Sequence, residues 1–319
     1  MARFQPVVDA MLAARAASRR SLATLRLVSA PIKGPEMAGA AGVVEQAEGD
    51  LAKGDLVFAP TLRCAWGDAA TVKVDAKALV KVPPSVPPAQ AAHLGAAAAA
   101  AALLDGAVAG DVVLHLGGEG AVGQVAAQLC AARGVSLVSL VGADVADAED
   151  AVEVLKNLGS VCAAPAAFAR TPTFRGVVAD LGAPSLLLVD AANIDAPAVN
   201  ALLDAEGAAA RRGALAAAHA VDVRDAKLLA ACAALLAPGA KVVAYDSTTG
   251  PISGADAFDG GAVDAKAAAA AADAVASHGV AVLSEAHTTA TLPRALHVAN
   301  GAVYKHAFRQ PLWLAEPLE

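Results

Sequence analysis

Three closely spaced glycines are the residues of this chain best suited to chemistry. Gly118, Gly120 and Gly123 form a Gly-x-Gly-x-x-Gly pattern that includes Val122. Glycines let a backbone approach a pyrophosphate closely, and the N-terminus of a following helix offers free N–H groups and the positive end of its dipole. These four residues are therefore the candidate cofactor-binding residues of the turn.

The segments on either side of the turn have the patterns that such a site needs. The apolar run Val112–Leu116 predicts a buried strand, residues 122–133 have apolar side chains at helical spacing, and residues 135–141 predict a second strand. Strand, glycine turn, helix and strand in this order are typical of a Rossmann-type nucleotide-binding unit. We therefore expect an α/β chain with a doubly wound parallel sheet.

The acidic residues near the turn leave its binding capacity open. Glu119 lies inside it, where two unit charges about 4 Å apart would repel by roughly 1 kcal/mol in water and about 4 kcal/mol at a surface-like dielectric. Its carboxylate either points outward or fills the anion site itself. After the second strand, Asp144 is the candidate ribose contact, and no basic residue stands beside it for a 2′-phosphate. The pattern predicts either a dinucleotide site or a Rossmann layer kept for packing alone.

Composition excludes several other classes of site and partner. The 319 residues suffice for two domains, and a net charge of −7 argues against nucleic acid as the main partner. The four cysteines are scattered and predict buried, reduced thiols, while Cys64 and His93 lack a third zinc ligand, so we expect no metal site. His115, inside an expected strand, predicts a hydrogen-bonded core residue rather than a catalytic base. The longest apolar stretch is mostly alanine, so no direct membrane span is expected.

The N-terminal segment differs in character from the rest of the chain. Its apolar residues recur at helical spacing, and five arginines face the single acid Asp9: Arg3, Arg15, Arg19, Arg20 and Arg26. Arginine-rich, acid-poor and amphipathic segments are typical of organelle targeting. We expect residues 1–21 to form a basic arm, either a mitochondrial targeting segment or a helix that docks on a partner.

A proline-rich hinge at residues 83–88 separates a β-rich start from a β/α middle. Before the hinge, strands are expected at residues 22–31, 39–45, 55–59, 70–74 and 79–82. After it, we expect helices at 89–104, 145–158, 264–277 and 292–299, strands at 186–189, 241–244 and 280–283, and a short apolar ending at 312–314.

An ordered set of short motifs connects these segments to a known family. The set comprises Ser29-Ala30-Pro31-Ile32, Lys53-Gly54-Asp55-Leu56-Val57, Leu94-Gly95, Ala109-Gly110-Asp111, Val122-Gly123-Gln124 and Leu158-Gly159-Ser160. In this order the motifs resemble the medium-chain dehydrogenase/reductase superfamily, and within it mitochondrial trans-2-enoyl-CoA (enoyl-thioester) reductases. The resemblance implies a GroES-like β domain (22–92 with 288–319) beside a Rossmann domain (93–287), NADPH between them and hydride delivery to an enoyl thioester.

Three segments that the family uses for catalysis are missing. A tyrosine-bearing loop after Ile32 is deleted, an Asn-Pro-x-Thr-Ala-Tyr stretch is replaced by alanines at residues 96–102, and an aromatic segment after Tyr245 is absent. Residues 204–227 look like an insertion. Because proton donor, substrate contacts and dimer edge are lost together, we assign no catalytic residue.

Two functions of different class follow from the resemblance and its departures. The first is a degenerate enoyl-reductase-like accessory structural subunit of a large mitochondrial assembly, a respiratory-chain complex or the mitoribosome, on the matrix side and in contact with other protein subunits. The alternative is an active NAD(P)H-dependent enoyl-thioester or quinone reductase. An intermediate case is a structural subunit that keeps NADPH as a folding ligand, since binding to the native state adds stability.

Overall fold

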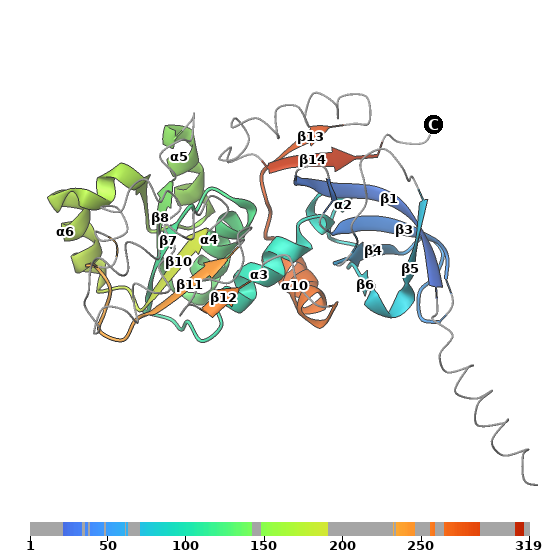
Figure 1. Cartoon of the computed structure of the whole chain (residues 1–319), viewed down its shortest axis with the longest axis horizontal. Coiled ribbons are helices and arrows are strands. Elements are labelled where there is room, and N and C mark those ends of the chain that lie inside the picture. Colours follow the sequence, from blue (N-terminus) through green and yellow to red (C-terminus); the bar gives the residue numbers. More distant parts are fainter. Residues whose placement is uncertain are drawn as a thin grey trace, which may run out of the picture.

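In the part of the chain that the structure describes, two sheets form with a pair of helices between them (Figure 1). A computed structural model describes residues 22–33, 36–37, 39–47, 49–60, 62, 71–141, 148–190, 232, 234–245, 256–258, 265–287 and 310–315. The expected arm at 1–21, the insertion at 204–227, the helix at 292–299 and Asp144 lie outside these residues. In the described part, no helix is long and apolar enough to cross a membrane.

The first sheet has eight strands, in the order β13-β14-β1-β3-β4-β6, with β2 and β5 also paired to β1. Its core side is apolar: Leu25, Val44 and Val57 are almost completely buried. All pairs are antiparallel except β13 with β14. The bounds are β1 Leu22–Lys33, β2 Glu36–Met37, β3 Ala40–Gln46, β4 Leu56–Ala59, β5 Thr71–Asp75, β6 Val80–Lys81, β13 Ser284–His287 and β14 Gln310–Leu314, with the 3-10 helix η1 at Ala76–Ala78.

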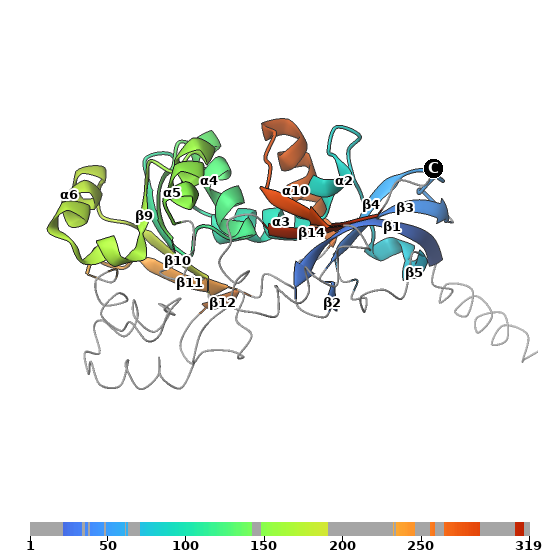
Figure 2. The same cartoon turned by 90° about the horizontal axis from the view of Figure 1, so that it is seen from above.

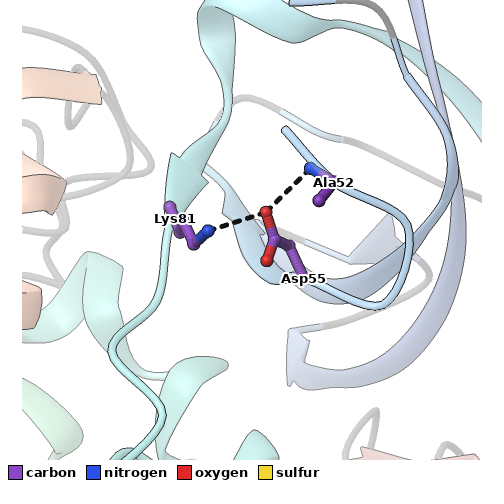
Figure 3. Close-up of polar contacts among 3 residues, drawn as sticks. All are labelled: Ala52, Asp55 and Lys81. Atoms are coloured by element: carbon purple, nitrogen blue, oxygen red, sulfur yellow. Dashed lines mark hydrogen bonds and ion pairs between the residues drawn. The ribbon is translucent and has the colours of Figure 1, made fainter. Parts of the chain in front are cut away.

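An ion pair links the edge strand β6 to the turn before β4 (Figure 3). Lys81 Nζ lies 2.9 Å from Asp55 Oδ2, and the same carboxylate oxygen accepts a hydrogen bond from the backbone N–H of Ala52. The Lys81 hydrogen bond, followed by the Ala52 N–H, holds the pKa of Asp55 below its usual value. The Asp55 side chain thereby fixes the turn from Ala52 to Asp55, which contains Lys53 and Gly54.

The second sheet has six parallel strands in the order β12-β11-β10-β7-β8-β9. Chain order reverses between β7 and β10, and this is the switch point at which open α/β sheets bind ligands. The strands are β7 Val112–Leu116, β8 Ser136–Val141, β9 Cys162–Pro165, β10 Leu186–Asp190, β11 Lys241–Tyr245 and β12 Asp256–Phe258. Around them lie α4 Ala121–Arg133, α5 Ala148–Leu158, the 3-10 helix η2 Ala166–Arg170 and α6 Pro172–Leu181.

Small side chains let the helices between the sheets approach closely. Helix α3 (Leu94–Leu103) packs against both α4 and α10 (Ala265–His278), and Figure 2 shows α3 and α10 between the two sheets. Residues 97–100 of α3 and several α10 alanines are buried in one common core. Alanine has the highest helix propensity and adds little width, so alanine-rich helices suit this position.

Most expected elements are confirmed with shifts of one to three residues at their ends, and two expectations are wrong. The helix expected at 89–104 is divided into α2 (Pro88–Ala91) and α3, because His93 adopts a non-helical backbone with φ −96° and ψ 8°. The strand expected at 280–283 begins instead at Ser284, because glutamine side chains occupy the backbone groups of residues 281–283.

The placement of β13 bears on the expected domain limits. Its four residues, Ser284–His287, pair with β14 and so lie in the first sheet, although the sequence grouped them with the Rossmann segment 93–287. The full division into an arm, a GroES-like domain (22–92 with 288–319) and a Rossmann domain stays a prediction.

Candidate functional site

The glycine turn connects β7 to α4 through a close contact that only glycine permits. Gly117 leaves β7 with φ +78°, and Gly120 precedes the first residue of α4. A Cβ at position 123 would lie 2.1 Å from the carbonyl oxygen of Gly118. Glycine at 123 therefore allows α4 to start directly against the turn, as the sequence pattern predicts.

The structure brings together four of the five predicted site residues. Gly118, Gly120, Val122 and Gly123 all lie in the turn or in the first turn of α4. The N–H groups at the start of a helix have no partner within it, so this end of α4 can in principle face an anion. The fifth residue, Asp144, lies outside the described residues, so the ribose contact stays a prediction.

An acid that the sequence reasoning missed lies across from the turn. Asp190 ends β10, on the other side of the switch point, and its Oδ2 would be 3.2 Å from a Cβ at Gly120. The signal in the sequence was a polar residue directly after the buried run Leu186 to Val189, at the carboxyl end of a parallel strand. Its neighbour in space, 70 positions earlier in the chain, is visible only in the fold.

Glu119 is buried inside the turn, with 4% of its surface exposed. Of the two orientations that the sequence left open, the outward one is therefore wrong. The turn thus contains one buried acid, and a second acid, Asp190, lies against Gly120, directly before the first residue of α4. An ionised carboxylate about 4 Å from a phosphate charge would cost about 4 kcal/mol at a surface-like dielectric. Acids at these positions disfavour a nucleotide diphosphate to the extent that they are ionised.

A buried polar layer lies under the turn. His115 on β7 and Tyr245 on β11 are joined by a hydrogen bond of 2.7 Å between Nε2 and the phenol oxygen, and both are almost completely buried. Nearby, the hydroxyls of Ser139 and Ser160 are 2.8 Å apart. Burial lowers the pKa of His115 to about 4, so the imidazole is neutral at pH 7. The prediction that His115 is a hydrogen-bonded core residue is confirmed.

The described residues offer no metal centre. No group of three His, Cys, Asp or Glu side chains among them is arranged to hold an ion. Cys64 lies outside the described residues, and His93 Nε2 is 2.7 Å from the Ser284 hydroxyl. Cys130 and Cys232 are buried free thiols whose pKa values burial raises to about 12, as expected for reduced packing residues. Cys162 is also a free thiol but is only partly buried, which differs from the expectation.

Sequence comparisons with known proteins match only a part of the chain. No protein-family profile matches the chain. It is 35% identical over 79 residues to the mitochondrial enoyl-[acyl-carrier-protein] reductase of Dictyostelium discoideum, a match that spans 25% of this chain and 22% of that protein.

Similar solved structures cover almost the whole chain. A quinone oxidoreductase of Pseudomonas syringae aligns over 92% of this chain and 91% of its own, with a TM-score of 0.63 and 16% identity. A mycobacterial protein in complex with NADPH gives the same coverages and TM-score at 17% identity. A crotonyl-CoA carboxylase/reductase aligns over 92% and 80%, with a TM-score of 0.62 and 16% identity. At these identities the likeness establishes the architecture of an antiparallel domain beside a Rossmann-type domain.

Proposed function

Because the chain has the fold of the medium-chain dehydrogenase/reductase superfamily, we propose that it is a degenerate enoyl-reductase-like protein that works without catalysis. Its role is that of an accessory structural subunit in a large mitochondrial assembly, a respiratory-chain complex or the mitoribosome, on the matrix side. Other protein subunits are its partners. In this proposal the fold serves as a scaffold for binding other subunits, and the cofactor site has lost its function.

The observation that carries this proposal is the buried carboxyl of Glu119 in the glycine turn. A site that must accept a diphosphate would place hydroxyls or backbone N–H groups there, because negative charge beside negative charge weakens binding. Asp190, across the switch point, places a second acid against the same turn. Tyr245, which could otherwise donate a proton, has its phenol buried against His115.

The mitochondrial part of the proposal is supported by the sequence and by one relative. Residues 1–21 form an arginine-rich, acid-poor segment, and the Dictyostelium protein that matches a quarter of the chain is mitochondrial. The loss of three segments that the family uses for catalysis, together with an inserted segment at 204–227, favours binding to protein subunits over turnover of a substrate.

Titration with NADPH tests the loss of the cofactor site. We expect no saturable change in NADPH fluorescence with the natural chain, and measurable binding with Glu119→Ser, which removes the buried carboxyl. Glu153→Ser is the matched control, because Glu153 is exposed on α5 and distant in sequence from the turn. Saturable micromolar binding of NADPH to the natural chain would refute the claim that the site is lost.

The alternative is an active NAD(P)H-dependent enoyl-thioester or quinone reductase. It is favoured by the intact Gly118, Gly120 and Gly123 and by the 35% identity to an enoyl-[acyl-carrier-protein] reductase. Consumption of NADPH with an enoyl thioester or a quinone would support it, provided that Gly123→Ala abolishes the activity while the protein remains folded. The absence of binding of both NADPH and NADH would exclude it.

A further inference from the structure

Three glutamines hold an extended segment that passes between the two sheets. Residues 281–283 connect α10 to β13 and belong to no strand. Their backbone N–H groups all donate to glutamine side chains: Ala281 to Gln128, Val282 to Gln90 and Leu283 to Gln124, over 3.0, 2.8 and 2.8 Å. Side-chain amides thus take the place that a neighbouring strand has in a sheet.

Two of these glutamines also donate a hydrogen bond back to the residue from which they accept one. Gln90 Nε2 donates to the carbonyl oxygen of Val282 over 3.1 Å, and Gln128 Nε2 donates to that of Ala281 over 2.7 Å. Each of these glutamines therefore pairs with one residue as a peptide group would. The third, Gln124, is completely buried and donates instead to the carbonyl oxygen of Glu119 in the glycine turn, over 3.0 Å.

The geometry of helix and extended chain explains the spacing. Gln124 and Gln128 are four residues apart on α4, a rise of about 6 Å. Residues 281 and 283 are two residues apart in extended chain, about 6.6 Å. Alternate residues of extended chain present their N–H groups to opposite sides, so residues 281 and 283 face α4 while Val282 faces Gln90 on α2.

The two sides belong to different halves of the molecule. Helix α2 packs on β1, β3 and β4 of the first sheet, and the Ser29 hydroxyl of β1 donates to the carbonyl oxygen of Pro88 at its start. Helix α4 follows β7 and packs on β8 of the second sheet. The segment 281–283 is thus hydrogen-bonded to both halves at once.

We propose that Gln90, Gln124 and Gln128 form a glutamine clamp on residues 281–283 that fixes the two halves of the molecule in one relative orientation. The clamp needs no ligand between the halves. Through Gln124, it also joins the backbone of the glycine turn at Glu119 to the segment that enters β13. This inference goes beyond the proposed function and holds whether or not the chain is catalytic.

Residue-resolved amide hydrogen exchange tests the individual contacts. Methionine matches glutamine in shape and lacks its hydrogen-bonding groups. Gln128→Met, Gln90→Met and Gln124→Met should each raise exchange roughly fivefold or more at one amide, those of Ala281, Val282 and Leu283 respectively. Gln128→Glu keeps the acceptor and should leave the Ala281 amide protected.

Calorimetry tests the link between the halves. The natural chain should unfold in one transition, and the triple methionine variant in two. Asn157→Leu is the matched control, because Asn157 is an exposed amide on α5, outside the clamp. Exchange at residues 281–283 no faster than in this control, or one undivided transition in the triple variant, would overturn the proposal.

Discussion

Acidification from pH 7.5 to pH 5 should destabilise the protein by about 2 kcal/mol through His115 alone. The imidazole is completely buried, and burial lowers its pKa from 6.5 to about 4. In the unfolded chain it titrates near 6.5, so between pH 6.5 and pH 4 the unfolded state binds more protons than the native state. Stability is therefore fully present above about pH 6.5 and falls with pH down to about 4.

The magnitude follows from the two pKa values. At pH 5, proton binding to His115 favours the unfolded state over the native state by a factor of about 30. This factor lowers the free energy of unfolding by about 2 kcal/mol. The whole window of 2.5 pKa units would contribute about 3 kcal/mol. This difference exceeds the usual uncertainty between two urea denaturation curves of closely related variants.

Urea denaturation at pH 7.5 and pH 5 measures the effect. His115→Gln keeps a polar group near Tyr245 but cannot titrate, so its loss of stability on acidification should be about 2 kcal/mol smaller than that of the natural chain. His278→Gln is the control, because His278 is exposed on α10, and it should show the natural loss. An equal loss in His115→Gln and the natural chain would refute the assignment of this pH dependence to the buried imidazole.

Three further predictions concern packing, a thiol and an ion pair. Gly123→Ala should destabilise the protein by at least about 3 kcal/mol. Gly176→Ala should stabilise it by about 0.5–1 kcal/mol, because Gly176 lies on α6 and its new Cβ would meet nothing within 4 Å. Thermal melts of the two variants measure both changes. Cys130, with a pKa of about 12, should resist iodoacetamide at pH 8 until the protein is denatured, and rapid labelling would contradict its burial. Lys81→Met should raise the pKa of Asp55, as measured by NMR titration of its carboxyl group. The same substitution should change the free energy of unfolding by less than about 1 kcal/mol. An unchanged pKa of Asp55 would mean that the ion pair is not formed in solution.

The glycine unit could be predicted from sequence because its signals are local. The strand Val112–Leu116, the turn and α4 follow from apolar periodicity and glycine spacing, and the structure confirms all three. Helix α6 was missed although Thr171-Pro172 carries the sequence signal of a helix start: the Thr171 hydroxyl accepts from the Phe174 N–H.

Long-range partnerships could not be predicted in the same way. The partner of His115 is Tyr245, 130 positions later in the chain, and the pairs of Gln90 and Gln124 with residues 282 and 283 span still longer separations. The strand expected at 280–283 was wrong for this reason, since apolar alternation indicates extended chain but not what satisfies its backbone. A weak signal existed in Gln124, a polar residue among the otherwise apolar residues of the buried face of α4.

The native size of the chain in gently solubilised mitochondria tests the central claim most directly. Native electrophoresis with mass-spectrometric detection of each band measures it without assuming a partner. The proposal of an accessory structural subunit predicts that almost all of the chain migrates with a complex of megadalton scale and remains there when NADPH is added. Migration of the chain as a free monomer or dimer would contradict the proposal.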